Sequence, residues 1–280
     1  MFTLNCKGRL LVIEEPIIMG IINTTPDSFY AGSRLVEKDA ALKKAEQIIN
    51  DGATIIDVGG QSTRPGSKRI SADEERGRVI PLIEAIHQRF PETFISIDSF
   101  YSLVVKDAVE AGACVVNDAS AGIIDADLIA TVATLKVPYV LMHMQGDPQT
   151  MQQNPTYDNV VLDVFDFLNK KIKQLHEAGI HDIIIDPGFG FGKTIEHNFE
   201  LLNALNFFRQ LSRPILIGLS RKATVYKTLN IGVDEALNGS TVLHTVSLLK
   251  GASILRVHDV KEAKQAIQLV QALTKKREQD

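Results

Sequence analysis

The amino-acid sequence contains no apolar run long enough to cross a membrane. Its first residues, MFTLNCKGRLLVIEEP, combine a short apolar run with charges that follow closely, which is unlike a secretory signal. We therefore expect a cytoplasmic protein that does not bind a membrane.

Cysteine is scarce, and an excess of positive charge is absent. The two cysteines, Cys6 and Cys114, lack the paired spacing of a metal site or a redox motif, so we predict that both are reduced and structural. The formal net charge of −4 and the pI near 6.0 give no broad basic surface for nucleic acid. Small-molecule partners are therefore expected, and a local cationic pocket for a small anion is compatible with this charge.

No linker rich in proline or serine and no low-complexity tract divides the chain, so we predict one domain over residues 1–280. Short runs that are almost continuously apolar alternate with amphipathic stretches, which is typical of a parallel sheet buried on both faces. About eight strand-then-helix units favour an α/β fold of the (β/α)8 TIM barrel type over an open doubly wound sheet. The runs are PIIMGIIN (16–23), TIIDVGG (54–60), TFISIDS (93–99), CVVND (114–118), YVLMHM (139–144), DIIIDPG (182–188), PILIGLS (214–220) and SILRVHD (253–259).

The stretches between these runs have helical periodicity. In residues 37–53 the apolar side chains recur at helical spacing, with lysine and glutamate on the other face. The opening residues, FTLNCKGRLLVI, place a Lys-Gly pair between two short apolar runs. This pattern predicts a short N-terminal β-hairpin that closes the bottom of the barrel.

Polar residues end the expected strands, and in such a barrel the catalytic groups come from the carboxyl ends of the strands. Taken singly, each of these residues is equally well explained as a cap or a turn former. Eight strand ends that converge on one mouth favour a binding site. In strand order the residues are Asn23, Asp57, Asp98, Asn117 with Asp118, His143, Asp186, Ser220 with Arg221 and Lys222, and Arg256 with His258.

The two sides of this mouth differ in chemistry. Asn23, Arg256 and His258 come from the first and last strands, which are neighbours in a closed barrel, and their donors suit a phosphate or pyrophosphate. The opposite arc carries carboxylates and an amide that accept parallel N–H bonds, so it favours a flat, donor-rich heterocycle such as an aminopyrimidine. Its residues are Asp98, Asn117 and Asp186.

Two polar residues of the mouth have alternative interpretations. Asp57 is either part of the chemistry or a buried carboxylate that accepts backbone N–H bonds, and we treat it as support. For His143, which two methionines flank, a wall position with satisfied hydrogen bonds is favoured over a chemical role.

The stretch DPGFGFGKT (186–194) follows the sixth expected strand and contains three glycines, two phenylalanines and a lysine. A nucleotide P-loop needs the spacing G-x-x-x-x-G-K-[ST], and the spacing here is one residue short. We therefore predict a tight loop over the strand end that exposes Asp186 and presents Phe189 or Phe191 as an aromatic wall.

Together these segments resemble the dihydropteroate synthase family, and the resemblance covers nearly the whole chain. Each segment alone is moderately specific, whereas their joint occurrence in this order leaves little room for chance. The segments are MGIINTTPDSF (19–29), DVGGQSTRPGS (57–67), SIDSF (96–100), VNDASAG (116–122), LMHMQGDPQTMQQNPTYDNV (141–160), DIIIDPGFGFGKTIEHNFELL (182–202), PILIGLSRK (214–222) and GASILRVHDV (251–260).

The resemblance implies a pterin-binding (β/α)8 barrel that condenses a dihydropterin methyl pyrophosphate with 4-aminobenzoate and releases pyrophosphate in folate synthesis. It implies that the pterin methylene loses pyrophosphate early and that the aryl amine then attacks, so no protein nucleophile is needed. It also implies Mg2+ near Asn23 and a homodimer. The pyrophosphate would be held by Asn23, Arg256 and His258.

The same resemblance implies the other substrate contacts. The pterin would lie in the deep pocket on Asp98, Asn117, Asp186 and Lys222, with Lys222 near its carbonyl group. Lys222, Asp98 and Arg256 are the residues expected to carry catalysis. The implied 4-aminobenzoate site consists of Ser62, Thr63, Arg64, Pro65, Phe191 and Lys222.

The first two strand-to-helix loops, TTPDSFYAGSR and QSTRPGSKR, are long, polar and rich in glycine and proline. We expect them to become ordered only when pyrophosphate or the pterin cation is present. The sequence departs from the family pattern at Gln61, where many members carry glutamate, and at Ala223, where a larger or hydroxyl-bearing residue often follows the lysine. Both departures concern the shape of the aminobenzoate end.

Two rival interpretations stay open. A pterin-binding methyltransferase shares the barrel and part of the Asp/Asn set but holds no pyrophosphate, so the SRK and RVHD segments favour the synthase. A barrel that binds pterin or assembles without catalysis is the second rival. The apolar helix over residues 240–250 is either a dimer face or a helix that faces the core.

Overall fold

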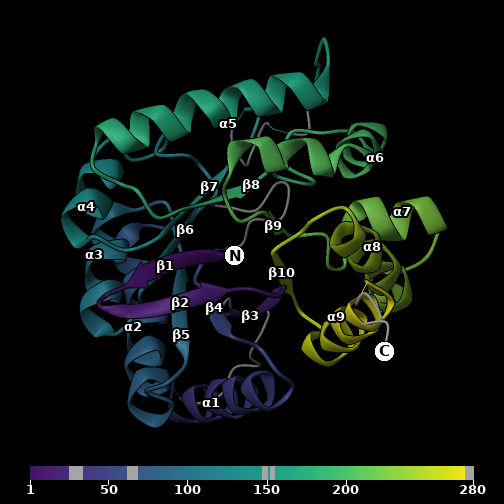
Figure 1. Cartoon of the computed structure of the whole chain (residues 1–280). Coiled ribbons are helices and arrows are strands. Elements are labelled where there is room, and N and C mark those ends of the chain that lie inside the picture. The colour runs from purple at the N-terminus through teal and green to yellow at the C-terminus, as the bar shows by residue number, and fades with distance from the viewer. Residues whose placement is uncertain (25–33, 62–68, 147–150, 152–154, 275–280) are drawn as a thin grey trace, which may run out of the picture.

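The computed structural model describes residues 1–24, 34–61, 69–146, 151 and 155–274. A ring of parallel strands is surrounded by helices, and a separate two-stranded sheet precedes it in the chain (Figure 1). The strands of the ring are β3 (Ile17–Asn23), β4 (Ile55–Gly59), β5 (Phe94–Asp98), β6 (Val115–Asp118), β7 (Tyr139–Met142), β8 (Ile183–Asp186), β9 (Leu216–Ile217) and β10 (Ile254–Val257).

The helices alternate with these strands along the chain. Side-chain caps start several of them, as at α2, where Ser71 accepts a hydrogen bond from the backbone N–H of Glu74. The helices are α1 (Arg34–Asn50), α2 (Ala72–Arg89), α3 (Ser102–Ala111), α4 (Leu128–Leu135), α5 (Val160–Glu177), α6 (Ile195–Asn203), α7 (Ala223–Leu229), α8 (Leu237–Leu249) and α9 (Val260–Thr274), with 3-10 turns η1 (Leu205–Leu211) and η2 (Val233–Glu235). Within the described ranges, no helix is long and apolar enough to span a bilayer.

The ring closes on itself. Strands β3 to β8 are neighbours in chain order, and β10 lies between β3 and β9. A parallel bridge between Ile185 and Ile215 joins β8 to the segment that leads into β9. The predicted (β/α)8 barrel is therefore confirmed.

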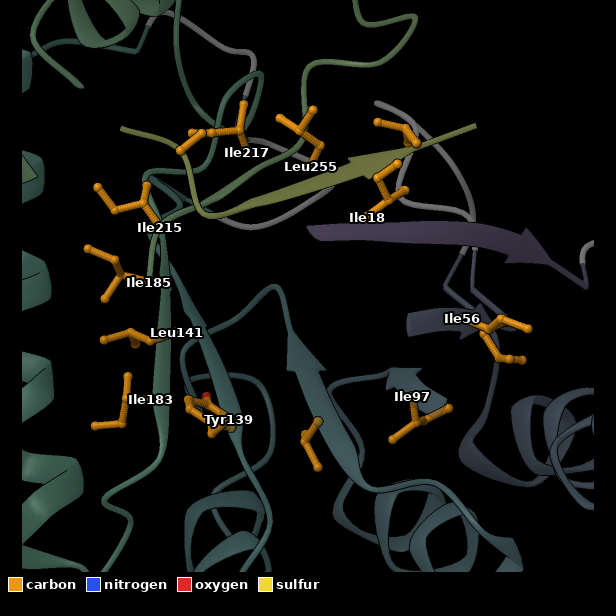
Figure 2. Packing of buried hydrophobic residues seen from close by; sticks show 14 of the residues in the cluster. Ile18, Ile56, Ile97, Tyr139, Leu141, Ile183, Ile185, Ile215, Ile217 and Leu255 are labelled. Carbon is orange, nitrogen blue, oxygen red and sulfur yellow. The ribbon is translucent and has the colours of Figure 1, made fainter. Parts of the chain in front are cut away.

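The outward-facing strand residues form one large apolar cluster with the helices. Figure 2 shows such side chains, among them Ile56, Ile97 and Leu255, arranged around the outside of the strands. The predicted amphipathic helix packs in this cluster, since Ala41 and Ile48 of α1 are almost fully buried. Both faces of the strands are covered, which explains why their sequences are almost continuously apolar.

A second apolar cluster fills the bottom of the barrel. It joins inward-facing residues near the amino ends of the strands to the hairpin of β1 (Phe2–Cys6) and β2 (Arg9–Ile13). Its members are Leu4, Cys6, Leu11, Ile13, Met19, Ile55, Cys114, Val115, Val140, Ile184, Leu216 and Ile254, with Phe2, Ile17 and Phe94 partly buried against them. The predicted hairpin at the barrel bottom is confirmed, and this cluster is called the barrel floor below.

Both cysteines lie in the barrel floor, where they are buried and free, as predicted. The neighbouring Cys114 thiol, together with burial, raises the pKa of Cys6. Cys6 and Cys114 are far apart in the chain, so their spacing did not indicate this contact.

We predict that Leu11→Ala lowers the free energy of unfolding by about 2–4 kcal/mol, because it leaves a cavity in the barrel floor. Its neighbour Leu10 is 64% exposed, whereas Leu11 is 2% exposed. Leu10→Ala is therefore the matched control, with an expected change below about 0.5 kcal/mol. Urea unfolding followed by circular dichroism measures both values, and equal losses would contradict the role of the hairpin as the floor.

Candidate active site

Above the barrel floor, the inward-facing positions become polar. Side chains alternate in direction along a strand, so the residues two and four positions beyond the floor also face the barrel axis. The first of these layers contains Ile21, Asp57, Ser96, Asn117, Met142, Asp186, Gly218 and Arg256. The next layer, at the mouth, contains Asn23, Gly59, Asp98, Ser220 and His258. Toward the carboxyl ends of the strands, the apolar floor is therefore followed by a set of mostly polar inward-facing side chains, with Ile21 and Met142 as apolar members.

Arg256 of β10 lies between two carboxylates. Its Nε donates a hydrogen bond to Asp57 Oδ2 at 2.6 Å, and its Nη2 donates to Asp98 Oδ2 at 2.5 Å. Burial disfavours the charge of Arg256, but attraction to the two carboxylates outweighs burial and raises its pKa. Sequence reasoning grouped Arg256 with Asn23 and His258, and it did not indicate this pairing across the mouth.

Residues of the two arcs meet along adjacent strands. Asn23, Gly59, Asp98 and Asn117 are paired in register across four adjacent strands. A Cβ atom on Gly59 would lie 3.5 Å from both Asn23 Oδ1 and Asp98 Oδ2, so the glycine lies beside both oxygens. Asn117 donates to Asp57 Oδ2 at 3.0 Å. Asp57 therefore supports both Arg256 and Asn117, and its hydrogen bonds come from these side chains rather than from the predicted backbone N–H groups.

Burial dominates the titration of Asp98. It raises the pKa of this carboxyl to about 7, and the attraction of Arg256 offsets only part of the effect. The nearby charges of Asp57 and Asp118 raise it further. An acidic group in this state can accept a hydrogen bond as the anion or donate one as the acid near neutral pH.

Lys222 lies at the start of α7 and reaches the loop that follows β8. Its Nζ donates to the backbone oxygen of Phe189 at 2.5 Å and lies 4.4 Å from the centre of the Phe191 ring. Burial lowers the pKa of Lys222 to about 8, while attraction to Asp186 opposes this shift. Asp186 itself accepts from the backbone N–H of Gly188 at 2.7 Å, and burial raises its pKa.

The loop DPGFGFGKT is the predicted tight loop over the strand end, but the prediction that it exposes Asp186 is wrong, because Asp186 is only 6% exposed. Phe191 provides the aromatic wall beside Lys222, whereas Phe189 is fully buried in the large cluster outside the strands. His143 is 6% exposed and contacts Lys193, so it occupies the predicted wall position.

The ends of β9 and β10 form the remaining edge of the mouth. Ser220 Oγ lies 3.1 Å from His258 Nδ1, and Arg221 makes two hydrogen bonds of 2.8 Å to Asp259. The imidazole of His258 is exposed at the rim, where partial desolvation and repulsion from Arg256 lower its pKa to about 4. The ring is therefore uncharged near neutral pH before an anion binds.

Several expected site residues lie outside the described residues, namely Ser62, Thr63, Arg64 and Pro65. The two loops expected to order on ligand binding also fall largely there, at 25–33 and 62–68. Gln61 is described, and its Oε1 accepts a hydrogen bond from the backbone N–H of Ile70.

The oxygen atoms at the mouth would suit a magnesium ion only together with ligands from outside the protein. Among the described residues, no group of three His, Cys, Asp or Glu side chains could hold a metal alone. Mg2+ in phosphate sites commonly uses one or two protein oxygens together with water and phosphate oxygens. Asn23, at the end of β3, would offer such an oxygen, whereas Asp98 Oδ2 already accepts a hydrogen bond from Arg256.

Glu75 of α2 is a buried carboxyl next to the mouth that sequence reasoning missed. It is fully buried, and its Oε2 accepts a hydrogen bond from Ser99 Oγ at 2.9 Å. Burial raises the pKa of Glu75 to about 7, although the bond from Ser99 lowers it in part. The acidic first turn of α2 carried no signal that distinguished Glu75 from its exposed neighbours Asp73 and Glu74.

Comparison with known proteins agrees with this geometry. The family profile described as "Pterin binding enzyme" matches residues 19–258. Dihydropteroate synthase of Escherichia coli K12 is 43% identical over 268 residues, which cover 95% of this chain and 94% of the relative.

Solved structures give the same result. A Yersinia pestis dihydropteroate synthase in a sulfonamide drug complex has a TM-score of 0.92 at 39% identity, covering 97% of this chain and 99% of that chain. A Xanthomonas albilineans dihydropteroate synthase with 4-aminobenzoic acid has a TM-score of 0.91 at 39% identity, with 97% of each chain covered. The Xanthomonas protein is also known in complex with 7,8-dihydropteroate.

A TIM barrel with a polar mouth of this kind defines the class of small-molecule enzymes that react at the carboxyl ends of the strands. The chain belongs to the pterin-binding enzyme family and, within it, to the dihydropteroate synthases.

We predict that Glu75→Gln removes a pH dependence from the stability. The folded-state pKa of about 7 exceeds the ordinary value of 4.5, so the folded protein holds a proton that the unfolded chain releases between these pH values. The free energy of unfolding of the wild type therefore falls as pH rises through this window. The free energy of unfolding of Glu75→Gln, compared with that of the wild type, should therefore rise by about 3 kcal/mol between pH 4.5 and 7.5.

Urea midpoints of both proteins at several pH values measure this difference. Glu84→Gln removes a carboxylate from an exposed position of the same helix and is the matched control. It should keep the pH dependence of the wild type. Parallel pH profiles for Glu75→Gln and the wild type would show that Glu75 is ionised throughout.

Proposed function

We propose that this chain condenses 6-hydroxymethyl-7,8-dihydropterin pyrophosphate with 4-aminobenzoate to give 7,8-dihydropteroate and pyrophosphate in folate biosynthesis. One observation carries the proposal. The hydrogen-bond acceptors that suit a pterin and the cations that suit a pyrophosphate meet at one mouth, in a chain that belongs to the dihydropteroate synthases. The enzyme is accordingly a transferase.

The pterin would occupy the deep side of the mouth. Asp98, Asn117 and Asp186 would accept hydrogen bonds from its amino-pyrimidine edge, because carboxylate and amide oxygens suit a row of parallel N–H donors. Lys222 would lie near the pterin carbonyl. Its lowered pKa of about 8 leaves it largely protonated at neutral pH, so it can donate to that oxygen.

The pyrophosphate would lie against Arg256, His258 and Asn23. Arg256 presents a guanidinium that stays charged, and His258 can take up a proton when an anion arrives, because a nearby negative charge raises a histidine pKa. Mg2+ near Asn23 would neutralise further charge on the phosphate oxygens. This metal and its ligand are part of the proposal.

The reaction needs no protein nucleophile. The C–O bond between the pterin methylene and the pyrophosphate breaks early, and its electron pair leaves with the pyrophosphate. The amine of 4-aminobenzoate then forms the C–N bond and loses a proton. The protein must hold two substrates in line and stabilise the departing charge, and both effects act strongly in a desolvated pocket.

We propose that Phe191 and Lys222, which lie in contact, bound the 4-aminobenzoate end. We propose that Ser62, Thr63, Arg64 and Pro65 complete it. A methyltransferase of the same fold would need no anion edge, so the cations on β10 and after β9 argue against that rival. A pterin-binding module without catalysis would have the same site residues, so only a measurement of turnover distinguishes it from the synthase.

Exposed apolar side chains on the last helices support a homodimer. Helix α8 has a core-facing side with His244 and Leu248, and we propose that its exposed side, with Val242 and Leu249, contacts the second subunit. Surfaces of this kind are typical of interfaces between subunits. The exposed apolar residues from α7 to α9 are Leu229, Val233, Val242, Leu249, Leu269 and Leu273. A cytoplasmic location stays a prediction of the sequence.

The direct test of the function is release of pyrophosphate by the purified chain with the pterin substrate and Mg2+, with and without 4-aminobenzoate. The proposal requires release that depends on the aryl amine and is matched by formation of dihydropteroate. Binding of pterin without any release would favour the non-catalytic module. Transfer of a methyl group from a methylated tetrahydrofolate would favour the methyltransferase.

We predict that Lys222→Ala lowers kcat/KM by the equivalent of about 2–4 kcal/mol, since a charge-assisted contact is lost in a closed site. Steady-state kinetics with both substrates measure the loss. The exposed Lys227 in the same helix provides the control, and Lys227→Ala should leave kcat/KM unchanged. An unchanged value for Lys222→Ala would remove Lys222 from the site.

We predict that Arg256→Ala weakens pyrophosphate binding about tenfold or more, measured by calorimetry in the presence of Mg2+. The variant loses a cation and also leaves Asp57 and Asp98 facing the anion. Arg209→Ala removes an exposed arginine in η1, away from the strand ends, and should bind pyrophosphate like the wild type. Unaltered binding by Arg256→Ala would show that the anion edge is wrongly assigned.

A further inference from the structure

Lys193 is a buried lysine that the proposed chemistry does not use. Its side chain is 2% exposed, and its Nζ lies 2.9 Å from His143 Nδ1, 2.9 Å from the oxygen of Gly188 and 3.1 Å from the oxygen of Phe191. The oxygen of His143 lies at 3.4 Å. The carbonyl oxygens carry no net charge. The His143 ring is also uncharged, because burial and the charge of Lys193 lower its pKa to about 2.

The loop of residues 187–192 folds around the ammonium group of Lys193, which follows it in the chain. Gly188 and Gly192 have φ values of 73° and 62°, which L side chains rarely adopt. A Cβ on Gly188 would lie 1.8 Å from the oxygen of His143, and one on Gly192 would lie 2.4 Å from the oxygen of Gln145. The glycines therefore let the loop press against the end of β7 and turn two carbonyl groups inward to Lys193.

The same loop presents its other groups to the mouth. The Phe189 oxygen receives the hydrogen bond of Lys222, and the Phe191 ring lies under the Lys222 ammonium. The backbone N–H of Gly188 binds Asp186. Three contacts of the mouth thus come from the short segment whose carbonyl groups Lys193 holds from behind.

Stability alone does not account for a lysine here. A buried ammonium among neutral acceptors loses more hydration than its hydrogen bonds return, and an apolar residue of similar length commonly packs at lower cost. Burial lowers the pKa of Lys193 to about 7, and the charge of Asp186 only partly opposes this. What the ammonium adds is direction, since it can bind several carbonyl oxygens at once and fix where they point.

We propose that Lys193 is a positioning residue, whose ammonium holds the loop of residues 187–192 so that the Phe189 oxygen and the Phe191 ring are fixed against Lys222. The inference deepens the proposed function and rests on it. The aryl amine depends on this arrangement through both Phe191 and Lys222, which we propose bound its end of the mouth, whereas the pterin shares the contacts of Lys222 and Asp186 with the loop. Pyrophosphate, on the arc of β3 and β10, does not depend on it.

The test compares Lys193→Met with the wild-type chain. Methionine is similar in length and packs well among apolar groups, but it donates no hydrogen bond to the carbonyl groups. We expect the KM for 4-aminobenzoate to rise about tenfold or more, since small displacements in a site are costly. The Kd for pyrophosphate should stay within about twofold of the wild type, because the hydrogen bonds of Lys193 go to His143, Gly188 and Phe191 and not to Asn23, Arg256 or His258.

Two further variants distinguish a specific effect on the position of the Phe191 ring from a general loss of stability. Lys173→Met replaces an exposed lysine of α5 and should leave both constants unchanged. In a Phe191→Ala background, Lys193→Met should raise the KM by much less than in the wild type, because the ring through which it acts is gone. Full additivity of the two changes would indicate that Lys193 does not act through Phe191.

A KM close to the wild-type value in folded Lys193→Met would overturn the inference, as would equal losses for both ligands. If this variant does not fold, His143→Gln decides, because it keeps an acceptor for Lys193 but moves it. In His143→Gln we expect the KM for 4-aminobenzoate to rise about threefold while the Kd for pyrophosphate stays unchanged. The absence of this selective rise would overturn the inference. An inactive wild-type chain would contradict the proposed function instead. In that case the Kd for 4-aminobenzoate replaces its KM in the comparison with the Kd for pyrophosphate.

Discussion

The arrangement of the mouth depends on the ion pairs between Arg256 and the carboxylates of Asp57 and Asp98. They tie the last strand of the barrel to β4 and β5, with β3 between them, directly above the apolar floor. Asp57 also receives the hydrogen bond of Asn117. One guanidinium therefore orders both arcs of the pocket. Loss of either carboxylate would leave part of a buried charge without its partner, which is strongly destabilising.

This network is possible because stability and chemistry occupy different levels of the barrel. The floor, where the hairpin packs against the strands, contributes buried apolar area and carries no group that reacts. Further along the strands most inward-facing side chains are polar, and burial is the largest cause of the shifted pKa values of Asp98, Asp186 and Lys222. Perturbed groups of this kind gather where binding requires them, and here they gather at the strand ends.

Much of the fold could be predicted from the sequence, because continuously apolar runs and the Lys-Gly pair are local patterns. The strand-end residues could be predicted as well, since parallel strands bring their carboxyl ends together. Sequence could not show that Arg256 reaches Asp57 and Asp98, because the strand order does not say how far a side chain extends. Nor could it choose between Phe189 and Phe191, since that choice depends on the backbone angles of the intervening glycines.

The central claim is that one mouth holds a pterin on one arc and pyrophosphate on the other at the same time. The most direct measurement titrates the chain with a fluorescent 6-hydroxymethylpterin, with and without saturating pyrophosphate and Mg2+. The account predicts that both ligands bind together, with pterin affinity maintained or increased by pyrophosphate. Mutual exclusion of the two ligands would contradict it.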